Sequence, residues 1–145
     1  MRRRLVLLSG VGVLVLGSPG AAAAKTHLPA FRSPSGNIEC FYGSSVLHCQ
    51  IGQADYAKTL QDRCMAGPSV DWHGFELGAT RKSALTCSGG ILYDPDTQVP
   101  YYVTLAYGKS RRLGGVTCSS AVTGVTCRNR AGHGLFISRQ SWRAW

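Results

Sequence analysis

The sequence predicts a small all-β domain, a barrel or a sandwich, that is held by disulfide bonds and contains at most one short helix. Three observations support this fold class. Two ten-residue segments begin and end with cysteine, residues 40–49 (CFYGSSVLHC) and 118–127 (CSSAVTGVTC). Apolar and polar residues alternate with a period of two in several stretches, which is typical of half-buried strands. Frequent glycines, including Gly89-Gly90 and Gly114-Gly115, indicate turns between short strands.

The N-terminal segment has the form of a secretory signal peptide. Three arginines at residues 2–4 precede an apolar stretch, residues 5–16, and a run of alanines ends at Ala24. The apolar stretch is too short for a membrane-spanning helix, which needs about 20 residues. We therefore expect cleavage within a residue or two of Ala24. Residues 1–24 are then the signal peptide, residues 25–145 form a single all-β domain, and the product is secreted without a transmembrane segment.

The first cysteine pair predicts a β-hairpin closed by its own disulfide. If Cys40 bonds to Cys49, residues whose numbers sum to 89 face one another, and Ser44 and Ser45 form a two-residue turn. The two cysteines then occupy a non-hydrogen-bonded position, where cross-strand side chains approach most closely. One face is mainly apolar and consists of Ile38, Cys40, Tyr42, Leu47, Cys49 and Ile51. The other face is mixed and consists of Asn37, Glu39, Phe41, Val46, His48 and Gln50.

The second cysteine pair predicts a second hairpin of the same form. Cys118 and Cys127 share one face with Val116 and Val125, and Gly124 supports the turn between the strands. The repeated spacing has the form of an internal pseudo-repeat, although two copies also arise by convergence on a stable hairpin.

Six cysteines, an even number in an exported chain, predict a disulfide framework rather than free thiols. Zinc is the alternative, but zinc fingers use closely spaced cysteines and the sequence contains no CxxC motif. With both hairpin pairs assigned, Cys64 and Cys87 are left for each other. Six cysteines allow fifteen connectivities, and the sequence by itself leaves the others open.

Between the two hairpins, the clearest strand signal is residues 101–107, where tyrosines and aliphatic residues occupy every second position. The single predicted helix spans residues 54–64, because Tyr56, Leu60 and Cys64 recur at four-residue spacing. Shorter strands are predicted at residues 74–77, 91–93 and 135–138.

Positive charge is concentrated in the C-terminal part of the chain. The net charge is +9 overall, and without the signal peptide 13 Lys and Arg stand against 7 Asp and Glu, which gives +6. Asp96 is the last acidic residue, so the basic residues that follow are unbalanced. A field of one sign attracts polyanions, whereas a solvated basic face is the simpler alternative. We predict a surface that binds an anionic cell-envelope polymer. This surface contains Lys109, Arg111, Arg112, Arg128 and Arg130.

Two further C-terminal features bear on function. His133 lies between two glycines and Ser138 lies on the predicted strand that follows, which makes them candidates for a general base and a nucleophile. The Gly-x-Ser-x-Gly motif of many hydrolases is absent, and a turn with a surface imidazole explains the segment as well. Trp142 and Trp145 end the chain, and we expect them to close the open end of the core.

Two acidic clusters complete the candidates for chemistry. Asp71, His73 and Glu76 lie close in sequence, but they supply fewer oxygen ligands than a calcium loop needs. Asp94 and Asp96 flank a proline, which favours a turn. We therefore expect no metal and no cofactor. Tyrosines beside basic residues also occur on single-stranded nucleic-acid surfaces, but strand packing accounts for them, and nucleic acid is not an expected partner.

Three segments resemble one known family. Residues 31–40 (FRSPSGNIEC), Cys49, and residues 127–139 (CRNRAGHGLFISR) are similar to a family of small secreted bacterial proteins, the domain of unknown function 6636. The resemblance implies an exported, cysteine-bonded domain, and it assigns no activity, ligand or catalytic residue. His133 and Ser138 match the motif at the end of the family.

The sequence thus favours a non-catalytic binding module over an enzyme. We expect a monomer that contacts an anionic envelope polymer or a protein partner through its basic C-terminal half. The alternative is a small secreted hydrolase that uses His133.

Overall fold

The computed structural model describes residues 24–66, 71–90 and 92–145. The predicted signal peptide therefore lies outside the described residues except for Ala24, and so does Ile91 of one predicted strand. Among the described residues, no helix is both long enough and apolar enough to cross a membrane.

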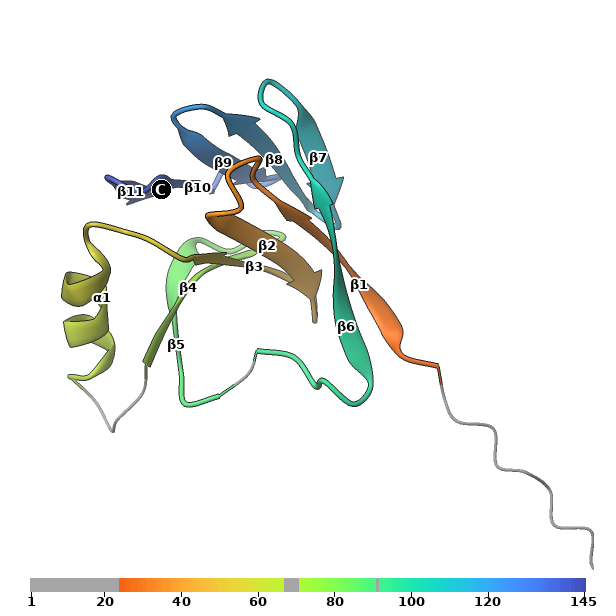
Figure 1. Ribbon diagram of the computed structural model, residues 1–145, viewed down its shortest axis with the longest axis horizontal. Coiled ribbons are helices and arrows are strands. Elements are labelled where there is room, and N and C mark those ends of the chain that lie inside the picture. The colour runs from red at the N-terminus through yellow and green to blue at the C-terminus, as the bar shows by residue number, and fades with distance from the viewer. Residues whose placement is uncertain (1–23, 67–70, 91) are drawn as a thin grey trace, which may run out of the picture.

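In the residues that the structure describes, two β-sheets and one short helix are present, which confirms the predicted all-β class and selects a sandwich over a barrel (Figure 1). Sheet A has the strand order β5-β4-β3-β2-β1-β6, and sheet B has the order β11-β10-β9-β8-β7. The strands of sheet A are β1 (Thr26–Arg32), β2 (Ile38–Gly43), β3 (Val46–Ile51), β4 (Asp71–Gly78), β5 (Ser83–Ser88) and β6 (Gln98–Thr104). Those of sheet B are β7 (Ser110–Leu113), β8 (Val116–Ala121), β9 (Gly124–Asn129), β10 (Gly134–Ile137) and β11 (Trp142–Ala144), and the helix is α1 (Ala57–Cys64).

Both predicted hairpins form with the predicted register. Cys40 faces Cys49 across β2 and β3, and Cys118 faces Cys127 across β8 and β9. The Cα atoms of the two pairs are 4.1 and 4.0 Å apart, the close approach of a non-hydrogen-bonded position. The third disulfide joins the last residue of α1 to β5, between Cys64 and Cys87.

The two hairpin disulfides lie in one core between the sheets. Their four cysteines are at most 1% exposed. Sheet A supplies Phe31, Leu47 and Phe75 to this core, and sheet B adds aliphatic side chains between them. The helix closes one side, where Leu60 is buried against the same cluster. The sheet B side chains of the core are Leu113, Val116, Val125, Leu135 and Ile137.

Sheet A contains one pairing that period-two patterns do not reveal. β6 covers most of the predicted strand at residues 101–107, but it runs parallel to β1 from Thr26 beside Gln98 to Arg32 beside Thr104. β1 was not expected. It contains Pro29 and has few alternating positions, and its place in the sheet depends on a partner about 70 residues away in the chain.

The outer face of sheet A is partly covered, although the hairpin pattern predicts burial mainly on the inner face. Phe41 projects to the outer side and is only 2% exposed, because it forms a second cluster with Leu28 and Ala30. Leu92 and Tyr93 pack against this cluster. They were predicted to be strand residues, but instead they belong to the β5–β6 connection, which runs below sheet A on the side away from sheet B (Figure 1).

The turn of the first hairpin places two non-glycine residues in the left-handed region, since φ is 51° at Ser44 and 66° at Ser45. This geometry is that of a type I′ turn, which Asn-Gly adopts with less strain than Ser-Ser. In the turn of the second hairpin, only Gly124 has a positive φ.

We expect the double substitution Ser44→Asn/Ser45→Gly to raise the free energy of unfolding by roughly 1 kcal/mol, because it relieves left-handed strain. Denaturant unfolding at constant pH measures the change. The matched control is Val122→Asn/Thr123→Gly in the second hairpin, whose turn residues have negative φ and gain nothing. Equal stabilisation by the two double substitutions would contradict the turn assignment.

His48 is a half-buried titratable group beside the outer cluster. Its ring stacks on Phe41 at 5.1 Å, and its Nδ1 is buried without a hydrogen-bond partner among the described residues. Burial lowers the pKa of His48 below its ordinary value, and the opposed charge of Glu76 on β4 only partly offsets this effect.

In the unfolded chain the imidazole of His48 binds a proton near pH 6.5, whereas in the folded chain it binds one only at lower pH. The unfolded state therefore gains protons first, and the stability contributed by His48 is lost as the pH falls. We expect the free energy of unfolding to decrease between pH 7.5 and 5.5. His48→Gln should remove most of this decrease, whereas His133→Gln, in the distant β9–β10 turn, should retain it. An unchanged pH profile for His48→Gln would refute the assignment.

Candidate functional site

Two predicted basic residues lie in one row on the outer face of sheet B. Arg112 of β7 faces Thr117 of β8, and Thr117 faces Arg128 of β9. Residues directly opposite each other in antiparallel strands project from the same face. The neighbouring Cys118 and Cys127 point into the core, so this row points to solvent, and all three of its side chains are exposed.

An aromatic ring continues the row at its far end. Gly134 faces Arg128, and backbone hydrogen bonds in both directions, at 3.0 and 3.1 Å, pair Gly134 with Trp145. The indole lies over Gly134, where a Cβ atom would collide with the ring, so glycine is needed for this packing. The guanidinium carbons of Arg128 and Arg143 lie 5.0 and 5.3 Å from the centre of the ring. Both cations are thus close enough for a cation–π interaction with Trp145.

We define the basic face as Arg112, Thr117, Arg128, Arg143 and Trp145. Every acidic residue of the chain precedes residue 97, whereas all of sheet B follows it. Residues 25–96 contain six Lys and Arg against seven Asp and Glu, and residues 97–145 contain seven Lys and Arg and no acid. The uneven distribution of charge along the chain therefore becomes an uneven distribution of charge between the two sheets.

The other predicted binding residues lie around this face rather than on it. Arg111 is opposite Cys118, so it leaves edge strand β7 on the inner side and is half-buried. Lys109 precedes β7 and is exposed, and Arg130 is exposed in the β9–β10 turn. The structure thus brings together two of the five predicted residues and adds Arg143 and Trp145. The sequence signal for Arg143 and Trp145 was their spacing of two residues, which places both on the same face of a strand.

The two terminal tryptophans differ in their role. Trp142 packs on the core, 5.1 Å from the ring of Phe75, as expected for closure. Trp145 lies instead on the outer face, because strand residues separated by an odd number of positions project to opposite sides.

His133 and Ser138 do not meet in one site. They stand immediately before and after β10, so they are separated by about 16 Å along the strand. Ser138 is 5% exposed, and its hydroxyl donates to the carbonyl of Ser141 and accepts from its N–H, at 3.0 and 3.1 Å. The backbone N–H of His133 donates to the side chain of Asn129 at 3.0 Å. Both segments are therefore ordered as turns.

The acidic clusters also separate in space or serve turns. Asp71 accepts a hydrogen bond from the side chain of Gln61, and Glu76 faces His48. Asp94 accepts from the N–H of Asp96, a bond that lowers the pKa of Asp94. In the part of the chain that the structure describes, no three His, Cys, Asp or Glu side chains gather as metal ligands.

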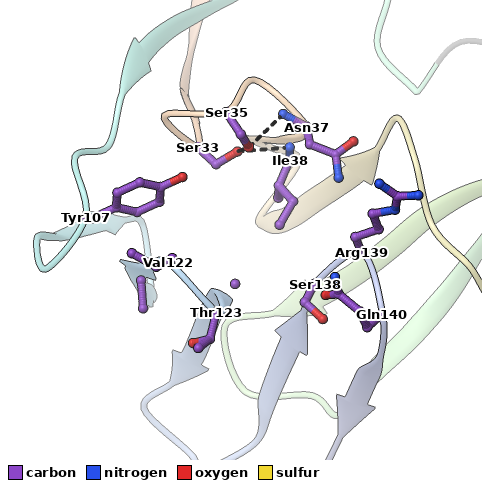
Figure 2. A pocket seen from close by; sticks show the side chains of 12 residues that line it. Ser33, Ser35, Asn37, Ile38, Tyr107, Val122, Thr123, Ser138, Arg139 and Gln140 are labelled. Carbon is purple, nitrogen blue, oxygen red and sulfur yellow. Dashed lines mark hydrogen bonds between the residues drawn. The ribbon is translucent and has the colours of Figure 1, made fainter.

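The segments that carry the family resemblance meet at a small cleft, although about 100 residues separate them (Figure 2). Its volume is about 170 Å³, and Figure 2 shows Tyr107 and Thr123 on one side with Asn37 and Arg139 on the other. Most of its polar groups already have partners. The side chain of Asn37 donates to the carbonyl of Gln53 and accepts from its N–H, at 3.0 and 2.7 Å. The Arg139 Nε lies 3.3 Å from Asp55. Asn37 therefore joins two loops of sheet A, and Arg139 joins the β10–β11 loop of sheet B to one of them.

The fold and the surface together define a disulfide-bonded β-sandwich with one basic, aromatic outer face. The chain belongs to the family of unknown function DUF6636, which it matches over residues 10–143. This confirms the resemblance predicted from the two motif segments and Cys49. Comparisons with curated proteins and with solved structures give no match.

We expect Asn37→Ala to lower the free energy of unfolding by about 1–2 kcal/mol, because it removes two side-chain hydrogen bonds to Gln53. The control is Gln53→Ala, which leaves both bonds intact because they use only the backbone of residue 53. Thermal and denaturant unfolding measure the two variants. Equal stabilities of the two variants would contradict this role of Asn37.

Proposed function

We propose that this protein is an exported, non-catalytic binding module whose basic face contacts an anionic polymer of the cell envelope. The observation that carries the proposal is the cluster of Arg112, Arg128 and Arg143 with Trp145 on one exposed sheet face. Among the described residues, none of the ion pairs involves these three arginines. Guanidinium groups suit this role because their planar donors match carboxylate and phosphate oxygens.

The electrostatic field of this face supports polymer binding over a single small anion. Adjacent strands are separated by about 4.8 Å, so Arg112 and Arg128, two strands apart, are spaced by roughly 10 Å. Charges at that spacing contact successive groups of an extended polyanion. The exposed hydroxyl of Thr117 lies between the two arginines and provides an additional hydrogen-bonding group.

Export is the second part of the proposal. Three disulfides are typical of an oxidising extracytoplasmic compartment, and they join all six cysteines of the chain. The signal-peptide pattern at residues 1–24 supports the same compartment. An envelope polymer is therefore a partner that the mature protein would meet.

The test compares two triple variants with the same change in charge. Arg112→Glu/Arg128→Glu/Arg143→Glu alters the basic face, whereas Lys58→Glu/Arg81→Glu/Lys82→Glu alters exposed residues outside sheet B. Retention on immobilised polygalacturonate and heparin is measured at low and high salt. We expect the first variant to lose affinity about tenfold or more at low salt, and the wild type to lose its retention at high salt.

The control variant should keep most of the wild-type affinity, because its charges lie outside sheet B. Equal losses in the two variants would show that only net charge matters and would reject the basic face as the contact surface. Weak retention of the wild type on both polyanions and on isolated envelope, at low salt, would reject an anionic polymer as the partner.

A further inference from the structure

A second concave site lies on the opposite side of the sandwich from the basic face. It is formed between the outer face of sheet A and the β5–β6 connection, with a volume of about 550 Å³. Volumes of this order are typical of small-molecule sites. The lining side chains come from four strands and the connection: Glu39, Phe41, Gln50, His73, Leu92, Tyr93 and Tyr102.

Aromatic rings form most of the apolar wall. Phe41 is buried beneath the site, Tyr93 contacts it edge to face at 5.4 Å, and Tyr102 packs on the same cluster. Burial raises the pKa of Tyr102 to about 12, so its phenol remains a neutral hydrogen-bond donor at physiological pH. The wall thus combines flat apolar surfaces with polar hydroxyl tips.

Polar side chains converge on the same space from adjacent strands. Glu39 faces Gln50 across β2 and β3, so a carboxylate and an amide project side by side. The register of β4 and β5 shifts between Trp72 and Gly74, which makes His73 the extra residue of a bulge and places it at the site. Bulges commonly re-aim a side chain beside a functional site.

The bulge is built on a glycine that no other residue can replace without rearrangement. Gly74 has a φ of 115°, and a Cβ atom at this position would collide with the carbonyl oxygen of Cys49. The position of His73 is therefore fixed by the close approach of two backbones in the sheet.

The charges at the site balance each other. Arg32 lies 3.7 Å from the carboxylate of Glu39, and its guanidinium carbon lies 5.3 Å from the centre of the Tyr102 ring. A second cation would be repelled by Arg32 and would find the face of Tyr102 already occupied. An anion would meet Glu39 in the wall. The site therefore favours a neutral ligand that both donates and accepts hydrogen bonds.

We propose that this pocket binds a neutral saccharide, whose apolar ring face packs on Tyr93 and whose hydroxyls pair with Glu39 and Gln50. Sugar rings combine an apolar face with a rim of hydroxyls, and the pocket offers the complementary surfaces. The inference is independent of the basic face, because none of its residues lines the pocket.

The experiment titrates the full mature protein with neutral trisaccharides by calorimetry. The probes are maltotriose, cellotriose, mannotriose and tri-N-acetylchitotriose, with trigalacturonate and the cationic trimer chitotriose as charged comparisons. Tyr93→Ala and the isosteric Glu39→Gln alter the pocket. Tyr101→Ala is the matched control, because Tyr101 is 63% exposed and does not line the pocket.

We expect at least one neutral probe to bind the wild type in preference to both charged trimers. Tyr93→Ala and Glu39→Gln should each weaken binding about tenfold, and Tyr101→Ala should change it less than twofold. The proposal is overturned if no neutral probe binds, if the charged trimers bind better, or if the pocket variants bind like Tyr101→Ala. The basic-face variant Arg112→Glu/Arg128→Glu/Arg143→Glu should bind the neutral probe normally, so failure of one proposal is distinguishable from failure of the other.

Discussion

The architecture of this protein is governed by the packing of the two sheets around their own hairpin disulfides. Cys40–Cys49 and Cys118–Cys127 each join neighbouring strands, and both are buried in the same core. Because side chains alternate along a strand, fixing these cysteines inward also fixes which residues point outward. A shift of one residue in either hairpin would bring Arg128 or Glu39 into the core, where an unpaired charge is strongly disfavoured. The disulfides therefore define the two outer faces as well as the core.

The two outer faces differ because the two sheets are drawn mostly from different parts of the chain. Sheet B uses only residues after 109, a region without acidic residues, and its outer face is basic. Sheet A contains residues of both signs, and Arg32 and Glu39 lie close enough to balance each other. One face is thus suited to a polyanion through its long-range field, whereas the other encloses a pocket whose recognition depends on shape and hydrogen bonds.

Glycines adjust both faces at the positions where backbone or ring must approach closely. Gly134 leaves room for the indole of Trp145, and Gly74 allows the bulge that places His73 at the sheet A pocket. The two motif segments, residues 31–40 and 127–139, serve a different purpose. Asn37 pairs with the loop that contains Gln53 and Asp55 within sheet A, and Arg139 joins the same loop to sheet B. In this structure the family motifs contribute to architecture more directly than to a reactive centre.

Local features of this protein could be predicted from residue spacing along the chain. Cysteine spacing predicted both hairpins and their register, four-residue spacing predicted a helix that forms at Ala57–Cys64, and the motif segments predicted the family. The sequence also indicated a basic C-terminal half and two of the residues on the basic face, Arg112 and Arg128. Four features depend on the tertiary structure. Two belong to sheet A: the parallel pairing of β1 with β6 and the burial of Phe41 beneath the β5–β6 connection. The other two belong to sheet B: the contact of Trp145 with two arginines and the separation of His133 from Ser138. The difference lies in sequence separation. Spacing along a strand specifies to which face of the sheet a side chain projects, but the packing of distant segments decides which residues it contacts there.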